Sequence, residues 1–348
     1  MDLDQTKLEL LLGKVITEVG AAQNAALVIV GDKLGLFRAL ASAPMTPAEL
    51  ANKTGTYERY VREWLSAQAA TGFATYDAGT KKFSLSPEQA AVFGIEDSPV
   101  NMSGAFMGLA SAYEDYEKLA DAFTTGEGLG WGSRCGCLFC GTERLFAPGY
   151  RANLIAEWLP ALDGVVPKLK KGGKVADVGC GHGVSTIVMA EAYPKSEFIG
   201  FDFHDASIKH ARGYINGHKN VRFETSGAQN FNEHDYDLVT MFDALHDMGD
   251  PVGVAAHVKK KLKRDGTLMI VEPMAQDKLE DNFNPVGRLF YAASTNFCVP
   301  ASLNQEVGTA LGAQAGEKRL REVLTEAGFT RIRLAHSTPF NLVLEAQP

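Results

Sequence analysis

The 348-residue chain has few cysteines, no excess of positive charge and no long apolar run. Its five cysteines are an odd number at uneven spacing, which excludes a small disulfide-stapled fold and favours a reducing cytoplasm. A net charge of -8 disfavours nucleic acid as the main partner. No run reaches the length of a membrane span, and the start, MDLDQTKLELLL, has acids where an export signal is basic. We therefore expect a cytoplasmic protein with no membrane partner.

What the chain does have is a glycine-rich turn between two apolar segments. Residues 174–184 read KVADVGCGHGV, and residues 198–203 read FIGFDF and contain Asp202. Glycines at a strand-to-helix turn let the backbone approach a ligand closely. An acid about twenty residues further on can receive two ribose hydroxyls. The pattern predicts a nucleoside-binding βαβ unit; the alternative is an ordinary crossover with a glycine-rich turn.

The glycine spacing indicates which nucleoside is bound. A dinucleotide site reads G-x-G-x-x-G, whereas this turn reads D-x-G-x-G-x-G and has Val184 where the third dinucleotide glycine would fall. Asp177 would repel a pyrophosphate but suits an ammonium group. S-adenosylmethionine (SAM) carries an ammonium group and no phosphate. The stretch therefore resembles the first motif of the class I SAM-dependent methyltransferases, which implies SAM as cofactor and S-adenosylhomocysteine as product.

The segment before this motif has the element order of a winged helix. Apolar periodicity predicts helices over 3–22 and 24–42, the second apolar almost all round and so buried. Thr46 and Pro47 then start a third helix, 57–71 is helical, and GFATYD and KKFSLS form a hairpin. Residues 44–85 hold five basic and four acidic side chains, a net charge of about +1 that is too small for DNA binding.

From residue 174 onward, strand and helix patterns alternate, which predicts an α/β fold with a doubly wound, mostly parallel sheet. The predicted elements are 174–178, 184–193, 197–202, 205–216, 220–224, 236–242, 250–263, 266–272, 316–327, 329–335 and 339–346. Ahead of them, helical patterns cover 99–124, 149–160 and 162–169, and a Gly/Cys-rich loop, GEGLGWGSRCGCLFCG, lies between the first two.

A winged helix joined to a SAM fold is similar to the small-molecule O-methyltransferases of bacteria and plants. The resemblance implies a seven-stranded Rossmann-like sheet whose last strand is antiparallel, and an N-terminal domain that pairs two subunits in a homodimer. It divides the chain into a winged-helix and dimerisation domain (1–98), a helical linker and cap (99–170) and a SAM-binding domain (171–348). An insertion at 273–315 would cover the site.

The resemblance also assigns residues to the cofactor. It places the methionine end of SAM at the glycine turn, the ribose at Asp202 and the adenine at Phe203 and the loop after the third strand, where Gln229 stands in place of the family's frequent aspartate. The cofactor-binding candidates are Asp177, Gly179, Cys180, Gly181, Gly183, Asp202, Phe203, Gly227, Ala228, Gln229, Phe242 and Asp243. Cys180 is a small residue that we expect to pack under the turn.

His246 is the catalytic candidate, because it begins a His-Asp pair after the fourth strand, where such enzymes carry their base. A neutral hydroxyl is a poor nucleophile toward a sulfonium methyl group, so a base must remove its proton as the bond forms. The function implied is methyl transfer from SAM to a hydroxyl of a small molecule. The alternative for His246 is a loop-capping hydrogen bond.

The remaining cysteines leave a second reading of the chemistry open. Cys135, Cys137 and Cys140 are either small loop residues near the pocket or ligands of a metal or metalloid, although one C-x2-C pair is half of a usual zinc set. A thiol, thioether or arsenic acceptor would need no base, so S- or arsenic methylation is the alternative enzyme function. A SAM-binding regulator that uses its winged helix on DNA is the alternative from another class.

Overall fold

The computed structural model describes residues 3–348, which divide into two compact units. The N-terminal unit comprises residues up to 110 together with 140–148, and the sheet unit comprises 111–139 together with 149–348. The segment 99–170, which we expect to be a linker and cap, is thus shared between both units. Over the described residues, no helix combines the length and apolar character that a membrane crossing needs.

The N-terminal unit is a winged helix, as the element order predicts. Its elements are α1 (Gln5–Lys33), α2 (Leu36–Ala41), α3 (Pro47–Thr54), α4 (Glu58–Thr71), β1 (Thr75–Asp77), β2 (Lys82–Ser84), α5 (Pro87–Gln89), the π-helical turn η1 (Ala90–Gly94) and α6 (Ser103–Glu114), whose last turn enters the sheet unit. Thr46 and Glu49 form a reciprocal capping box at the start of α3, and β1 pairs antiparallel with β2. Phe37, Trp64 and Phe93 form the centre of its core.

The first helix differs from its prediction. Instead of breaking near residue 23, α1 runs without interruption to Lys33, because no helix breaker stands at the expected junction. The chain turns only at Gly35, which adopts a left-handed φ of 69° before α2. Nor is the predicted second helix buried all round: Leu27, Val30 and Leu34 are exposed.

The sheet unit contains a seven-stranded sheet in the order β5-β4-β3-β6-β7-β9-β8. The strands are β3 (Lys174–Val178), β4 (Glu197–Asp202), β5 (Val221–Thr225), β6 (Tyr236–Phe242), β7 (Leu262–Pro273), β8 (Arg331–Ser337) and β9 (Asn341–Gln347). Only β9 runs against the others, so the prediction of a mostly parallel sheet with its last strand antiparallel is confirmed. The order reverses between β3 and β6, and ligands bind at such a switch point, beyond the carboxyl ends of the strands.

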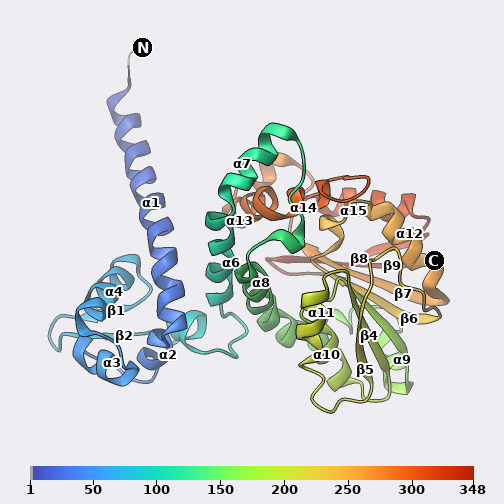
Figure 1. Cartoon of the computed structure of the whole chain (residues 1–348), viewed down its shortest axis with the longest axis horizontal. Coiled ribbons are helices and arrows are strands. Elements are labelled where there is room, and N and C mark those ends of the chain that lie inside the picture. Colours follow the sequence, from blue (N-terminus) through green and yellow to red (C-terminus); the bar gives the residue numbers. More distant parts are fainter. Residues whose placement is uncertain (1–2) are drawn as a thin grey trace. The chain divides into compact units, whose positions relative to one another are not determined.

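Helices cover both faces of this sheet (Figure 1). One face packs against α12 (Pro251–Lys261) and α15 (Gly316–Glu326), and the other against η3 (Tyr150–Trp158), α9 (Val165–Lys171), α10 (Val184–Ala192) and α11 (Asp205–Arg212). The remaining helical segments are α7 (Tyr116–Thr125), η2 (Trp131–Ser133), α8 (Gly136–Gly149), η4 (Leu245–Asp247), η5 (Leu279–Asn282), α13 (Pro285–Ala293), η6 (Ser294–Cys298) and α14 (Val299–Leu303). The α8 helix begins inside the predicted Gly/Cys-rich loop, so that prediction is too long at its C-terminal end.

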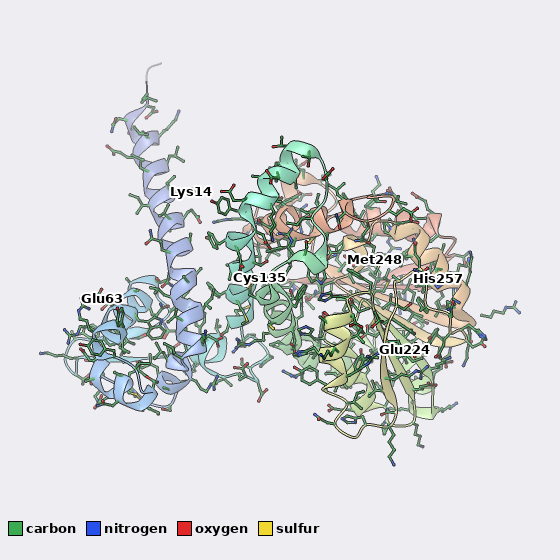
Figure 2. All side chains as sticks on the ribbon, in the orientation of Figure 1. Lys14, Glu63, Cys135, Glu224, Met248 and His257 are labelled. Atoms are coloured by element: carbon green, nitrogen blue, oxygen red, sulfur yellow. A yellow bond between two sulfur atoms is a disulfide. The ribbon has the colours of Figure 1, made fainter. Side chains whose placement is uncertain are left out.

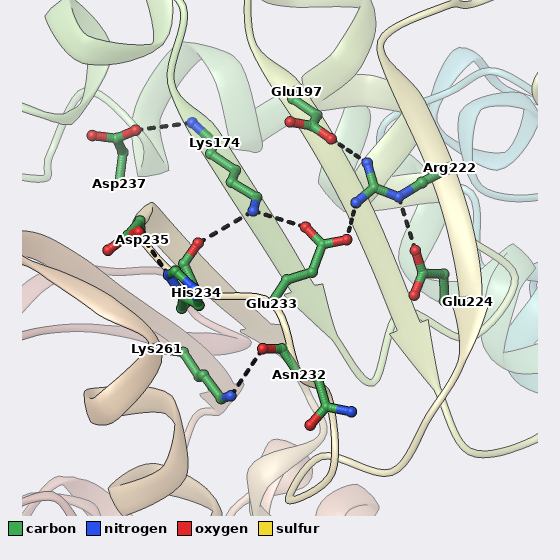
Figure 3. Close-up of polar contacts among 10 residues, drawn as sticks. All are labelled: Lys174, Glu197, Arg222, Glu224, Asn232, Glu233, His234, Asp235, Asp237 and Lys261. Atoms are coloured by element: carbon green, nitrogen blue, oxygen red, sulfur yellow. Dashed lines mark hydrogen bonds and ion pairs between the residues drawn. The ribbon is translucent and has the colours of Figure 1, made fainter.

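Ion pairs join the amino-terminal edge of the sheet, opposite the switch point (Figure 3). The Arg222 guanidinium on β5 contacts the carboxylates of Glu197, Glu224 and Glu233. Lys174, at the start of β3, places its Nζ 2.7 Å from the same Glu233 carboxylate. Charged side chains therefore line this edge, and the residues described next lie at the carboxyl edge.

Candidate active site

The glycine turn links β3 to α10 at the switch point. Gly179, Gly181 and Gly183 all adopt left-handed backbone angles, with φ of 76°, 53° and 82°. The backbone N–H groups of Gly179 and Cys180 donate to the carbonyl oxygen of Phe201 on β4. Backbone hydrogen bonds thus fix the turn to the neighbouring strand.

The three glycines meet different surroundings. A Cβ at Gly179 would lie 2.9 Å from the Cβ of Ala244, and one at Gly183 would lie 2.5 Å from the Phe223 ring. A Cβ at Gly181 would meet no atom within 4 Å. The outer two glycines therefore allow close packing, whereas Gly181 borders open space that a ligand can enter.

Asp202 ends β4 beside this open side. Its Oδ2 accepts a hydrogen bond from the Gly181 N–H at 2.9 Å, and its Oδ1 accepts one from the His204 N–H at 2.8 Å. Burial raises the pKa of Asp202. The ring of Phe203, next in sequence, is 57% exposed and so available for stacking.

Asp177 lies beneath the turn, which differs from the expectation that it faces the ammonium group of a ligand. Its carboxylate accepts hydrogen bonds from the hydroxyls of Ser185 (2.7 Å), Thr186 (2.6 Å) and Thr240 (3.0 Å). The residue is 1% exposed, and burial raises its pKa. Because these hydroxyls enclose it, Asp177 braces the turn from below. Cys180 is likewise buried, with its sulfur 2.9 Å from where Gly200 would carry a Cβ.

The loop after β5 lies next to the end of β4. The Ser226 N–H donates to the Asp202 carbonyl oxygen at 2.9 Å, and Asn230 closes a turn on Gly227. Gln229, predicted to read the adenine, donates from its Nε2 to Asp250 at 3.0 Å. In this state the Gln229 amide nitrogen is therefore engaged at the start of α12.

Asp243 follows β6 and has an unusual backbone for a non-glycine residue, with φ of 47°. Its carboxylate accepts hydrogen bonds from the Tyr150 hydroxyl and the Asn341 amide, each at 3.5 Å. Burial, followed by the nearby Glu272 charge, raises the pKa of Asp243 to about 8. Phe242 packs against Tyr150, with ring centroids 5.1 Å apart, and is mostly buried. No local sequence pattern indicates that Tyr150 and Asn341 meet Asp243.

His246 lies in η4 and is buried among acidic side chains. Its Nδ1 is 2.5 Å from Oε2 of Glu272, at the end of β7, and its Nε2 is 3.2 Å from Oδ1 of Asp247. The other Glu272 oxygen accepts a hydrogen bond from the Leu245 N–H at 3.0 Å. Glu272 therefore orients the imidazole ring. It was missed from the sequence, although an acid at the carboxyl end of an apolar strand is the same signal that identified Asp202.

The charge state of His246 follows from these neighbours. Burial alone lowers the pKa of the imidazole, but Glu272 and Asp247 together raise it well above its usual value. Cys298 also contacts His246, and burial followed by the Asp247 charge raises the pKa of its thiol to about 12. The ligand atoms of His246, Asp247 and Cys298 lie within 4.8 Å of one another and have the chemistry of metal ligands.

The Gly/Cys-rich segment contains a disulfide bond between Cys135 and Cys137. This differs from the reduced thiols expected in that segment. A Glu114 carboxylate oxygen lies within 4.8 Å of both sulfur atoms, while Cys140, Cys180 and Cys298 remain free. In this oxidised state the pair offers no thiolate to a metal.

Both parts of the chain match known families. Residues 169–328 match the family model of a methyltransferase domain, and residues 22–94 match that of the Rv2258c-like winged HTH domain. Demethylmenaquinone methyltransferase of Staphylococcus aureus is 26% identical over 182 residues, which are 49% of this chain and 73% of that protein.

Solved structures align over nearly the full length. Human N-acetylserotonin methyltransferase, solved in complex with SAM, has a TM-score of 0.69 at 18% identity and covers 99% of this chain and 98% of its own. An O-methyltransferase family protein from Burkholderia thailandensis has a TM-score of 0.68 at 19% identity, with 97% of each chain covered. Mitomycin 7-O-methyltransferase has a TM-score of 0.64 at 17% identity, with coverage of 99% and 100%.

The match over residues 169–328, the sheet order and the glycine turn together show that the chain carries a methyltransferase domain with the class I SAM-dependent fold. More narrowly, its N-terminal winged HTH domain and its whole-chain fold are similar to those of the small-molecule O-methyltransferases. Recognition from the sequence is confirmed at this level.

Proposed function

We propose that the protein transfers the methyl group of SAM to a hydroxyl of a small-molecule acceptor, with His246 as general base. The observation that carries this proposal is the Glu272–His246 pair at the carboxyl edge of the sheet, where His246 follows the strand next to that of the glycine turn and Glu272 ends the strand after it. The SAM-bound structure of N-acetylserotonin methyltransferase and the name of the mitomycin 7-O-methyltransferase support a SAM donor and an oxygen acceptor.

The residues at the turn fit SAM. Gly181 borders open space, Asp202 ends the adjacent strand with a carboxylate suited to two ribose hydroxyls, and Phe203 offers an exposed ring to adenine. Asp243 is the acid that remains for the ammonium group, since Asp177 is enclosed by hydroxyls. Bound SAM supplies the electrophilic methyl group. Gly179, Cys180, Gly183, Gly227, Ala228, Gln229 and Phe242 remain predicted contacts or supports.

In the proposed reaction the acceptor hydroxyl gives its proton to Nε2 of His246 as its oxygen attacks the methyl carbon. Glu272 holds Nδ1 and stabilises the imidazolium that forms. Because His246 is only 3% exposed and Cys298 contacts its ring, we expect the η6 segment to shift when the acceptor enters. The closed pocket then excludes water and aligns the reacting atoms.

One observation favours a second candidate, methyl transfer to a thiol, thioether or arsenic. The raised pKa of His246 extends the pH range over which the ring is protonated, and an imidazolium cannot accept a proton. A thiolate is already nucleophilic and needs no base. The Cys135 and Cys137 pair gives this candidate no further support, since both sulfurs are oxidised.

We propose no nucleic-acid partner for the winged helix. The two arginines of α4 are paired with acids one turn away on the same helix, Arg59 with Glu63 at 2.6 Å and Arg62 with Glu58 at 2.7 Å. Pairing of this kind leaves little positive charge for phosphate groups. We propose instead that the N-terminal unit forms a homodimer through the apolar side chains that α1 exposes: Leu10, Leu11, Leu12, Val15, Ile16 and Val19.

A panel of acceptors with labelled SAM tests the function. We expect the wild type to methylate a phenol or hydroxy acid, and the His246→Ala variant to lose about 10²- to 10⁴-fold in rate while it retains S-adenosylhomocysteine binding. Transfer to a thiol, thioether or arsenite that survives His246→Ala would instead establish the second candidate. Failure of the folded wild type to bind S-adenosylhomocysteine would contradict both.

A further inference from the structure

A feature that the proposed reaction does not use is the segment 131–139, which carries the disulfide. The two ends of this segment, Trp131 and Phe139, pack against each other with ring centroids 5.6 Å apart. Phe139 also packs on the His204 ring, with centroids 4.6 Å apart. His204 is the residue whose N–H binds the Asp202 carboxylate. The segment therefore lies against the residues proposed to hold the nucleoside of SAM.

The middle of the segment contacts η6, the helical turn next to His246 that we expect to shift when the acceptor enters. The Arg134 side chain is buried, and its Nη2 donates to the Asn296 carbonyl oxygen at 2.5 Å. Its guanidinium also lies 3.7 Å from the Asp115 carboxylate and 5.5 Å from the centre of the Phe297 ring. Cys135 directly follows Arg134 in the chain, and Cys298 directly follows Phe297. The segment thus bridges the two halves of the proposed site.

The disulfide has the surroundings of a labile bond. Cys135 immediately precedes the fourteen-residue helix α8 and Cys137 lies in its first turn, at the positive end of the helix dipole. The Cys137 N–H donates to the Cys135 sulfur at 3.3 Å. A helix N-terminus stabilises thiolates, which favours the reduced form, although the nearby Glu114 carboxylate opposes this effect. Both cysteines are half-buried, so a small thiol can reach them.

The spacing argues against a role in holding the fold together. Only one residue separates the two cysteines, and the stabilisation by a disulfide grows with the length of the loop that it closes. A bond across so short a loop restricts the unfolded chain very little. Its effect is therefore on the local shape of the segment 131–139.

We propose that Cys135 and Cys137 form a redox-active dithiol/disulfide site whose state sets the affinity for the methyl donor. A thiolate of a small-molecule thiol or protein dithiol attacks one sulfur, the S–S bond breaks, and the other sulfur leaves as a thiolate that takes up a proton. The second thiol of the dithiol, or a second molecule of a monothiol such as glutathione, then resolves the mixed disulfide. Two electrons and two protons pass to the protein, and the reductant ends as a disulfide. The link to affinity rests on the proposed SAM site; the redox chemistry does not.

Mass spectrometry tests the redox site on the full-length chain. The protein is equilibrated at a series of ratios of reduced to oxidised glutathione, quenched with acid and alkylated with N-ethylmaleimide under denaturing conditions. We expect three adducts at the oxidising end, on the free cysteines, and five at the reducing end, with one reversible transition between them. The Cys140→Ser variant keeps this difference of two adducts. The double variant Cys135→Ser/Cys137→Ser shows three adducts at every ratio.

Five adducts on the wild type at every ratio, or loss of the transition in Cys140→Ser, would overturn the redox site. Calorimetric titration with S-adenosylhomocysteine tests the link to affinity. We expect the dissociation constant to be about tenfold higher for the reduced wild type than for the oxidised wild type. The double variant should bind S-adenosylhomocysteine with the same affinity under reducing and under oxidising conditions. Equal affinity in both states of the wild type would refute the link. No binding in either state would count against the proposed SAM site and leave the mass result standing.

Discussion

At the scale of single residues, the proposed chemistry centres on a buried imidazole between two acids. Glu272 holds Nδ1 of His246 at 2.5 Å and Asp247 lies 3.2 Å from Nε2. The same carboxylate that orients the base also raises its pKa. Glu272 therefore makes the imidazole a stronger base, but it also lowers the fraction of His246 that is neutral at a given pH.

The pH dependence of the rate follows from this opposition. Because its pKa is raised, His246 stays protonated, and so inactive as a base, to a higher pH than a free histidine, and kcat/KM should therefore rise at a higher pH than for an unperturbed imidazole. In Glu272→Gln the pKa of His246 falls, and the rising limb of the profile should move to lower pH while the maximum rate drops about 10²-fold. Initial rates across a pH series measure both effects.

The control for this prediction is Glu345→Gln, because Glu345 is another buried strand carboxylate but pairs with Arg333 instead. Glu345→Gln should leave the pH at which kcat/KM rises unchanged. A limb that stays in place in Glu272→Gln would show that a group other than His246 controls the rate.

At the scale of elements, the glycine turn is defined from both sides. Hydroxyls of Ser185, Thr186 and Thr240 gather on the Asp177 carboxylate below it, and the Asp202 carboxylate binds the Gly181 N–H beside it. The glycines differ in what prevents a larger residue at each position. At Gly183 it is the neighbouring atoms, and at Gly181 it is the left-handed backbone angle together with the space for the ligand.

Two alanine substitutions distinguish the effects of neighbouring atoms from those of the backbone angle and the ligand space. Gly181→Ala should cost about 1–2 kcal/mol of folding stability from its left-handed backbone, yet weaken S-adenosylhomocysteine binding at least about tenfold because its methyl group enters the ligand space. Gly183→Ala adds a clash with the Phe223 ring and should cost about 3 kcal/mol or more. Urea unfolding and calorimetric titration measure the two quantities. Equal losses of stability, with binding kept in Gly181→Ala, would contradict this assignment.

At the scale of the whole molecule, α1 exposes a row of large apolar side chains. Leu10 and Ile16 are 72% and 71% exposed, and the neighbouring leucine and valine side chains on the same helix are also exposed. An apolar stripe of this kind is costly in water unless another surface covers it. A second copy of the same helix is the partner proposed above.

Sedimentation tests the dimer. We expect the wild type to sediment as a dimer and the double variant Leu12→Glu/Ile16→Glu as a monomer, because buried carboxylates oppose association. Lys14→Glu is the matched control: it changes the net charge by the same amount, its side chain lies on the same helix (Figure 2), and it leaves the apolar stripe intact. A monomeric wild type, or dissociation of the control alone, would refute the proposal.

The sequence by itself determined the features of the fold that depend only on residues close together in the chain. The capping box at Thr46, the three glycines of the turn and the acid that ends the next strand are local patterns, and each is present in the structure. Alternation of apolar strands and helices was enough to predict the parallel sheet, because burial on both faces demands it. Even so, the uninterrupted α1 shows that an apolar rhythm does not fix where a helix ends.

Only the tertiary structure decided which distant groups meet and what charge they carry. Glu272 reaches His246 from 26 residues away, because β6 and β7 are neighbours in the sheet, and Tyr150 reaches Asp243 from 93 residues away. Likewise, Asp177 is turned inward by hydroxyls from α10 and β6, which no local pattern announces. The physical reason is that burial and the nearest charges set a pKa, and both arise only when separate segments pack together.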